Sequence, residues 1–309
     1  MRSTMTAPVA RRRPGTGLLY LVTSGLLWGT GGLTGSLLSR VAGLSAMSVA
    51  ACRLTAGGVL IVTFLTVAGR RWPAGRAGRR WPAGRAAWTR IAVIGVLAAL
   101  YQSCYFTAVA LTSVALATLV TIGTAPVIVL GVYRVTGRPA GRLAPVAACL
   151  ALVGLGLLVG LPSGFSQTAV LASAGMAVVA AAGFATITLT GARPVPGLDD
   201  LTVTGFGFAL GGLILMPLAA ALGGLSFRPG PEAVGLLIAL GVGPTAVAYT
   251  LYFRGLRRAA ASTAAVLALL EPLTGAILAA FVLGQRLSPA GIAGAATLVA
   301  ALLVTVRGR

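Results

Sequence analysis

Ten apolar stretches, each roughly 17 to 25 residues long, dominate this chain. A helix of that length crosses a hydrocarbon core of about 30 Å. Only 9% of the 309 residues are charged, against about 25% in soluble domains. We therefore expect an all-α integral membrane protein with ten transmembrane helices; nine is the main alternative count, because some connectors are very short. The stretches lie near 17–38, 44–67, 88–109, 114–133, 143–160, 168–191, 201–222, 233–253, 260–282 and 288–306.

The arginines are distributed very unevenly between the connectors. With ten spans both termini share a side, and 20 of the 24 basic residues, all arginines, fall on that side. Three (Arg40, Arg228 and Arg286) fall on the other side, and Arg53 lies within a span. The positive-inside rule then places both termini in the cytoplasm. The sequence predicts a multi-pass protein of the cell inner (plasma) membrane, whose partner is the lipid bilayer.

A net charge of +20 would in a soluble chain suggest a nucleic-acid partner. Here we expect no nucleic-acid binding, because the charge follows the topology. The tandem repeat "RRWPAGRAGRRWPAGRAAW" (70–88) lies in the connector between the second and third spans. We interpret it as part of the same topology signal.

Residues that commonly carry enzyme chemistry are scarce. Histidine is absent, and Cys52, Cys104 and Cys149 each stand alone in an apolar stretch. Catalysis requires converging nucleophiles, bases or metal ligands. We therefore expect no enzyme, no cofactor and no metal site.

The two halves of the chain resemble each other. Gly57 and Gly58 in the second span align with Gly211 and Gly212 in the seventh. Pro126 in the fourth span aligns with Pro272 in the ninth. Because five spans are an odd number, the second copy must be inverted, as in many secondary transporters. The predicted parts are a basic cytoplasmic N-terminus (1–16), a first repeat (17–160), a second repeat (161–306) and a cytoplasmic C-terminus (307–309).

Several motifs resemble one transporter family. They are "GLLWGTGG" (25–32), Arg53, "YFTAVALTSVALATL" (105–119) with Ala125 and Pro126, "AYTLYFRGLRRAAASTAAVLALLEP" (248–272) and "LGQRLSPAGIAGAATLVAALLV" (283–304). Together they resemble the EamA-type branch of the drug/metabolite transporter superfamily. The resemblance implies two five-helix repeats, a central cavity and movement of small metabolites, often amino acids, usually outward. Gln285 stands where the family commonly has a glutamate, which argues against a coupling role at that position.

Glu271 is the only acid within a span and Arg53 the only arginine. They lie about eleven and nine residues into spans that enter from opposite sides, so both are expected roughly 13–17 Å deep at 1.5 Å per residue. Intramembrane charges usually face a cavity or a partner. They could hold the two charges of a zwitterion, or Glu271 could carry an exchanged proton. A mutual ion pair that locks the two spans together is an equal alternative.

Further polar and aromatic residues lie within the spans. Trp28, Gln102, Tyr101 and Tyr249 are candidate substrate-binding residues, because a polar tip inside a span needs a partner. Anchoring at the membrane interface is a strong alternative for the tyrosines. Pro126, Pro244 and Pro272 are candidate hinge or gate positions. For Pro244 a static kink would fit equally well.

The sequence thus predicts a secondary transporter of small organic solutes, amino acids or related metabolites, acting by alternating access around a central cavity. Protons are a candidate coupling ion. The alternatives are a cationic drug exporter and a membrane sensor that transports nothing.

One consequence concerns the repeat at 70–88. Deleting one copy, "RRWPAGRAG" (70–78), should leave transport into liposomes largely intact, because the remaining arginines keep the connector on the same side. Loss of transport by a correctly inserted deletion variant would show that this connector does more than set topology.

Overall fold

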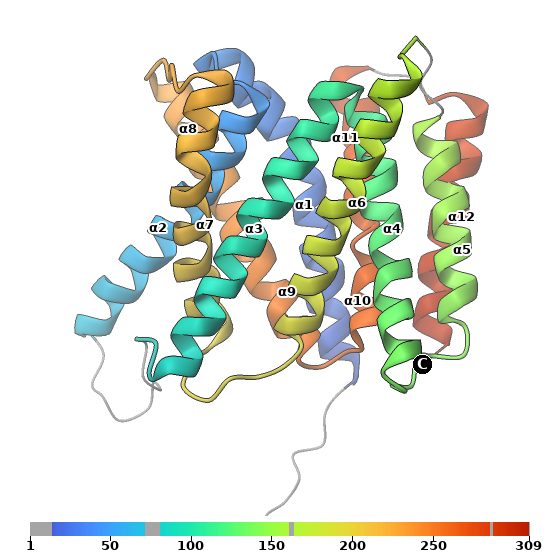
Figure 1. Ribbon diagram of the computed structural model, residues 1–309, viewed down its shortest axis with the longest axis horizontal. Coiled ribbons are helices and arrows are strands. Elements are labelled where there is room, and N and C mark those ends of the chain that lie inside the picture. Colours follow the sequence, from blue (N-terminus) through green and yellow to red (C-terminus); the bar gives the residue numbers. More distant parts are fainter. Residues whose placement is uncertain (1–13, 72–80, 161–163, 285–286, 309) are drawn as a thin grey trace, which may run out of the picture.

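The computed structural model describes residues 14–71, 81–160, 164–284 and 287–308, which form a bundle of helices (Figure 1). Within these ranges the chain forms ten helical rods, since α8, η1 and α9 run on as one rod and α10 and α11 as another. The elements are α1 (Pro14–Ala42), α2 (Ala46–Arg71), α3 (Arg85–Leu111), α4 (Val114–Val135), α5 (Ala144–Val159), α6 (Gln167–Gly191), α7 (Asp200–Gly223), α8 (Pro231–Leu240), η1 (Gly241–Val247), α9 (Ala248–Leu256), α10 (Ala261–Leu267), α11 (Leu270–Leu283) and α12 (Pro289–Arg307).

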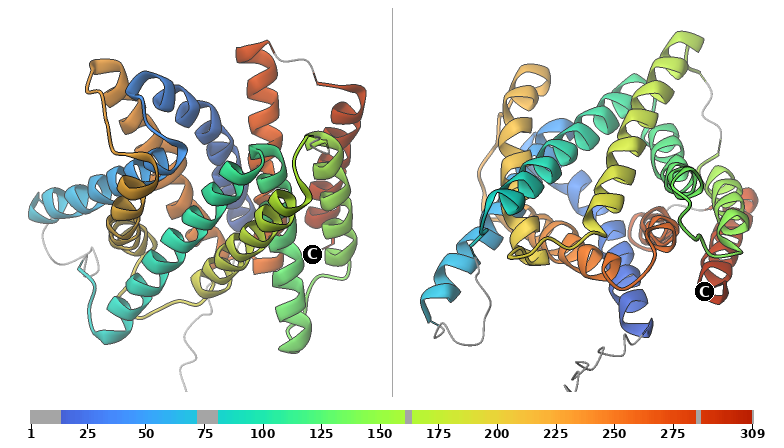
Figure 2. Two further views of the ribbon diagram at one scale, coloured as in Figure 1. Left: turned by 45° about the horizontal axis from the view of Figure 1, so that its top comes forward. Right: turned by 60° about the horizontal axis from the view of Figure 1, so that its bottom comes forward.

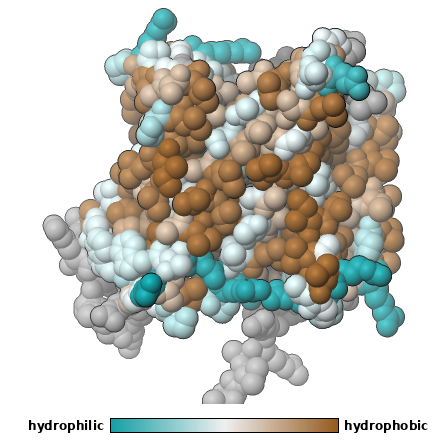
Figure 3. Space-filling model, viewed as in Figure 1, coloured by the Kyte–Doolittle hydropathy of each residue, from teal (hydrophilic) through white to brown (hydrophobic). Residues whose placement is uncertain are grey.

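The bundle has the length and surface of a membrane protein. Eight of the described rods are long and apolar enough to cross a membrane, α5 is an apolar helix of 16 residues, and α1 extends over 29 residues. Large apolar side chains such as Leu19, Phe64, Leu171 and Phe281 are exposed. In Figure 3 apolar residues, drawn brown, cover much of the middle of the face, and hydrophilic residues, drawn teal, lie mostly at its upper and lower edges. Lipid is the solvent that such a surface fits. The predicted all-α membrane fold is confirmed, and the ten rods agree with the predicted count of ten transmembrane helices.

Both ends of the described chain lie at the lower end of the bundle in Figure 1. We call this end, where α1 begins and α12 ends, the basic end, and the other the opposite end. Arg40 and Arg228 belong to the opposite end. The predicted topology residues Arg2, Arg11, Arg12, Arg13, Arg76, Arg79, Arg80, Arg286 and Arg309, and also Gln285, lie outside the described residues. The described arginines of the basic end are Arg70, Arg71, Arg85, Arg90, Arg134, Arg138, Arg142, Arg193, Arg254, Arg257, Arg258 and Arg307.

The packing pairs show the inverted repeat. Helices α2 and α7, which are equivalent in the two halves, pack against each other, and so do α5 and α12 (Figure 2). The other main contacts also come in equivalent pairs. The contact of α3 with α6 is equivalent to that of α1 with α8 and α9, and the contact of α4 with α6 to that of α1 with α11. The contact of α3 with α7 is equivalent to that of α2 with η1. A pseudo-twofold axis between α2 and α7 on one side and α5 and α12 on the other accounts for this pattern. Two inverted five-helix repeats are therefore confirmed.

The contact between α2 and α7 is a backbone contact. A Cβ atom added to Gly58 would clash with the backbone of Ala209, and one added to Gly212 would clash with Thr55. These two contacts are equivalent, because Gly58 aligns with Gly212 and Thr55 with Ala209. Small residues allow this approach, and dispersion then holds helices together where no hydrophobic effect can.

The three predicted hinge prolines lie in different surroundings. Pro244 is inside η1, a stretch of π-helix in which Thr245 donates a hydrogen bond to the Leu240 carbonyl at 2.8 Å. Pro272 follows the break between α10 and α11. Pro126 lies within the unbroken α4. π-helical stretches and helix breaks are frequent at functional sites. A hinge role for each proline stays a prediction.

The glycine contact leads to a stability test. Gly58→Ala should lower the midpoint of thermal unfolding in mild detergent, because overpacking a close contact costs about 1–3 kcal/mol. Gly131→Ala is the matched control, since a Cβ at Gly131 meets no atom within 4 Å and alanine favours a helix by about 0.5–1 kcal/mol. Equal midpoints for the two variants would contradict the close contact.

Candidate functional site

A cavity of about 280 Å³ lies between the two repeats. Its wall comes from the last part of α1, the first part of α2, the last part of α3 and the first residue of α4. Each of these segments belongs to the half of the bundle away from the basic end. The wall residues Gly32, Ser36, Ala46 and Val114 are exposed, so the cavity opens at the opposite end. We call it the central cavity.

Arg53 and Glu271 both line the central cavity. The sequence predicted that they lie at a similar depth, and the structure brings them to one space. No ion pair joins them within 4.0 Å, the described ion pairs being those of Asp200 with Arg254 and Arg257. The alternative prediction, an ion pair between Arg53 and Glu271 that holds their two helices together, is therefore not met in this conformation of the described chain. Both charges are turned toward the same solute-sized space.

Two nitrogen atoms near the cavity lack partners. Within the described chain, Arg53 Nε and Gln102 Nε2 are buried and make no hydrogen bond. Gln102 itself is 1% exposed and lines the cavity wall. An unpaired buried donor costs about 1–3 kcal/mol. A solute that brings an acceptor, such as a carboxylate, would recover this cost.

Aromatic rings form one side of the wall. Tyr101, Tyr105 and Phe106 follow one another along α3, and the rings of Tyr101 and Tyr105 stack with centroids 6.2 Å apart. The hydroxyls of Tyr105 and Thr118 share a hydrogen bond of 2.8 Å. Both tyrosines lie in the cavity wall, and Tyr101 is buried. That they bind solute, and do not serve as interfacial anchors, stays a prediction.

Other wall residues were not predicted. Ser36 and Ser39 line the cavity from α1, and Phe106 lines it from α3. Gly31, Gly32 and Gly35 keep the wall of α1 free of side chains there. The glycines and hydroxyl residues between Gly29 and Ser36 could have indicated a cavity wall, but glycines at this spacing are more typical of close helix packing.

Tyr249 and Trp28 lie beyond the central cavity, toward the basic end. Tyr249 lines a second space of about 10 Å³, which shares Tyr101 and Glu271 with the central cavity and adds Thr121. Trp28 lines neither space. Its ring centroid is 4.8 Å from those of both Tyr249 and Tyr252, and its Nε1 has no hydrogen-bond partner among the described residues. These rings form an aromatic floor, which we define as Trp28, Phe184, Phe208, Tyr249 and Tyr252.

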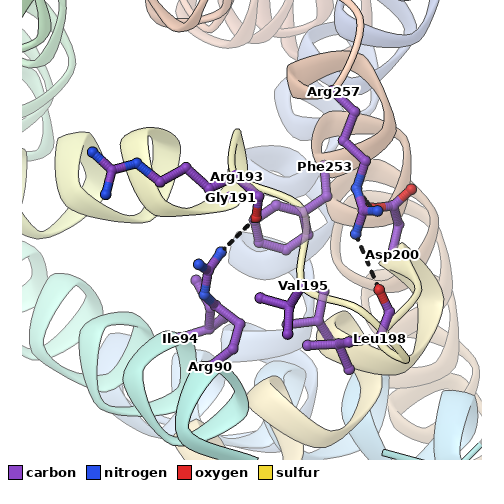
Figure 4. Close-up of a pocket in the computed structure, with 10 residues that line it drawn as sticks. Arg90, Ile94, Gly191, Arg193, Val195, Leu198, Asp200, Phe253 and Arg257 are labelled. Atoms are coloured by element: carbon purple, nitrogen blue, oxygen red, sulfur yellow. Dashed lines mark hydrogen bonds and ion pairs between the residues drawn. The ribbon is translucent and has the colours of Figure 1, made fainter. Parts of the chain in front are cut away.

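Ionic and polar contacts join the helix ends at the basic end (Figure 4). Arg257 at the end of α9 forms an ion pair of 2.6 Å with Asp200 at the start of α7, and donates a hydrogen bond to the Leu198 carbonyl at 3.3 Å. Arg90 of α3 donates to the carbonyls of Thr190 and Arg193. The space left between these residues is about 10 Å³. Between these residues of the described chain the basic end is nearly filled, whereas the central cavity opens at the opposite end.

Comparison with known proteins gives the same architecture. The model of the EamA-like transporter family matches residues 15–160 and 171–307. The uncharacterized transporter YwfM of Bacillus subtilis (strain 168) is 30% identical over 93% of this chain and 92% of its own. The uncharacterized inner membrane transporter YicL of Salmonella typhimurium is 25% identical over 87% of each chain. A solved crystal structure with 23% identity superposes with a TM-score of 0.75 over 94% of this chain and 96% of its own, which shows a shared fold. On this evidence the chain belongs to the EamA-like transporter family.

Proposed function

We propose that this protein is a secondary transporter that moves small organic solutes, amino acids or related metabolites, outward across the inner membrane. In this proposal the basic end faces the cytoplasm, as the positive-inside rule requires. The observation that carries the proposal is the central cavity, which holds an arginine and a glutamate that do not pair with each other. The solute binds there, and the two repeats rock so that the cavity opens to one side at a time.

The size of the cavity supports a small solute. Pockets for drug-sized ligands measure roughly 300–1,000 Å³, and this one measures about 280 Å³. The aromatic wall adds apolar surface for a side chain. A small metabolite with one apolar group fits these dimensions better than a large amphipathic drug.

The charges of the cavity support a zwitterion. Arg53 and Gln102 offer donors to a carboxylate, and Glu271 offers an acceptor to an amine. The aromatic rings and Glu271 by themselves would also suit an organic cation. Arg53, however, has no acidic partner within 4.0 Å among the described residues, so its charge would repel such a cation. We therefore favour amino acids over cationic drugs.

The test is counterflow of a radiolabelled amino-acid panel in proteoliposomes. We expect Glu271→Gln and Arg53→Ala each to reduce counterflow of the transported amino acid by at least about tenfold, because a hydrogen bond to a charged group contributes about 1.5–3 kcal/mol. The matched controls are Glu232→Gln and Arg138→Ala, both at exposed residues that are not part of the cavity wall. They should transport normally.

Unchanged counterflow in both cavity variants would remove these residues from the site. Counterflow of an organic cation in place of amino acids would support the drug exporter. If no solute of either class is exchanged by folded protein, a sensor becomes the better explanation.

A second test concerns the coupling ion. Glu271 is the one carboxylate of the cavity wall in the described chain, so it is the group that we propose to exchange a proton for solute. An imposed pH gradient should then drive uptake of the amino acid against its concentration gradient, and Glu271→Gln should lose this accumulation. Equal accumulation with and without the gradient would mean that the protein is a facilitator.

A further inference from the structure

The inverted repeat gives each part of the central cavity a counterpart at the basic end. Two contacts across the axis show which residues of α3 and η1 are counterparts. A Cβ on Gly57 would lie 2.8 Å from the Gly241 carbonyl oxygen, and a Cβ on Gly211 would lie 2.8 Å from the Gly95 carbonyl oxygen. Since Gly57 corresponds to Gly211, Gly95 corresponds to Gly241. Ile94 and Leu240, which directly precede these two glycines, are therefore counterparts of each other.

The small space at the basic end is the counterpart of the central cavity. Leu240, Val49 and Ala46 line the central cavity. Their counterparts Ile94, Val203 and Asp200 line the space beside Arg257. One space measures about 280 Å³ and the other about 10 Å³. The basic-end space is therefore the same vestibule of the inverted repeat in its closed form.

Asp200 and Arg257 give the closed vestibule bonds that the open one lacks. Asp200 is paired with Arg257 at 2.6 Å and lies 4.0 Å from Arg254. By the same correspondence the counterpart of Asp200 is Ala46. The π-helix η1 adds one residue between Gly241 and Arg257, so the counterpart of Arg257 is Ala110. Neither counterpart carries a charge, so an equivalent ion pair cannot form at the opposite end.

The side chains of this pair reach across the vestibule. Figure 4 shows Arg257 extending from the end of α9 to Asp200 and Leu198, which lie at the start of α7 and just before it. Arg90 spans from α3 to the last turn of α6 and to Arg193 beyond it. The closed state thus joins α3, α6, α7 and α9, which must separate if this vestibule is to open.

We propose that the ion pair between Asp200 and Arg257 is a latch that holds the basic-end vestibule shut and sets the resting preference for the conformation open at the opposite end. This inference rests on the alternating access of the proposed function. In the other conformation the latch is broken, and Ile94, Val203 and Asp200 line an open vestibule. Asp200 is a positioning residue for the transport cycle and does not touch solute in the central cavity.

The latch can be tested without knowing the solute. In a background with Cys52, Cys104 and Cys149 changed to serine, Val203→Cys reports on the basic-end vestibule and Val49→Cys on the central cavity. The measurement is the rate of maleimide labelling in detergent, where both ends are accessible. Adding Asp200→Asn should raise the labelling rate of the Val203→Cys protein several-fold and lower that of the Val49→Cys protein.

The chain offers matched controls. Asp199→Asn removes a charge from the adjacent residue and keeps a side-chain oxygen for the cap of α7, where Asp199 accepts from the Thr202 amide at 2.7 Å. It should change neither labelling rate. Arg257→Gln should repeat the effect of Asp200→Asn, and the double variant should show no larger effect than either single variant.

Faster labelling at both reporter cysteines would mean general loosening of the fold, and unchanged labelling rates would mean that the pair is no latch. Either result would overturn the proposal. Because labelling requires no transport, failure of the proposed solute class would leave this test intact.

Discussion

Helices α2 and α7 approach so closely that Gly58 and Gly212 leave no room for a side chain, and the relation between the two repeats depends on this contact. It brings Thr55 next to Gly212 and sets the face of α2 that turns toward the interior. Arg53, two residues earlier on α2, then reaches the central cavity. A larger residue at either glycine would push the two helices apart, and the cavity wall would move with them.

The cavity also explains how two charges persist inside a membrane protein. A charge at the centre of a span costs about 2.5–3.5 kcal/mol on insertion scales. A mutual ion pair would reduce that cost, yet Arg53 and Glu271 do not form one in the described chain. The cavity opens at the opposite end, so both groups face a space that a polar solute can enter. The cost that remains is the basis for specificity, because a solute that satisfies both groups is favoured over one that satisfies neither.

The sequence predicted the spans well because they depend on hydropathy and length alone. The shared depth of Arg53 and Glu271 was also accessible, since helical rise converts position into depth. Trp28 shows the limit: its place in the aromatic floor depends on which face of α1 meets Tyr249 and Tyr252, and α1 is apolar all round. Asp200 was missed for a related reason. Its partner Arg257 is 57 residues away, and only the folded chain shows that the two helix ends meet.

The energy of the latch is consistent with a transport cycle. Conformations that interconvert differ by only a few kcal/mol, so a contact that must break in every cycle has to be weak. Exposed ion pairs contribute about 0.2–1 kcal/mol, and here the side chains of Arg257 and Asp200 are 29% and 13% exposed, which allows a somewhat larger value. One or two kcal/mol changes a population ratio by about 5- to 30-fold. The pair can thus bias the resting state strongly and still yield to the binding energy of a solute that favours the other conformation.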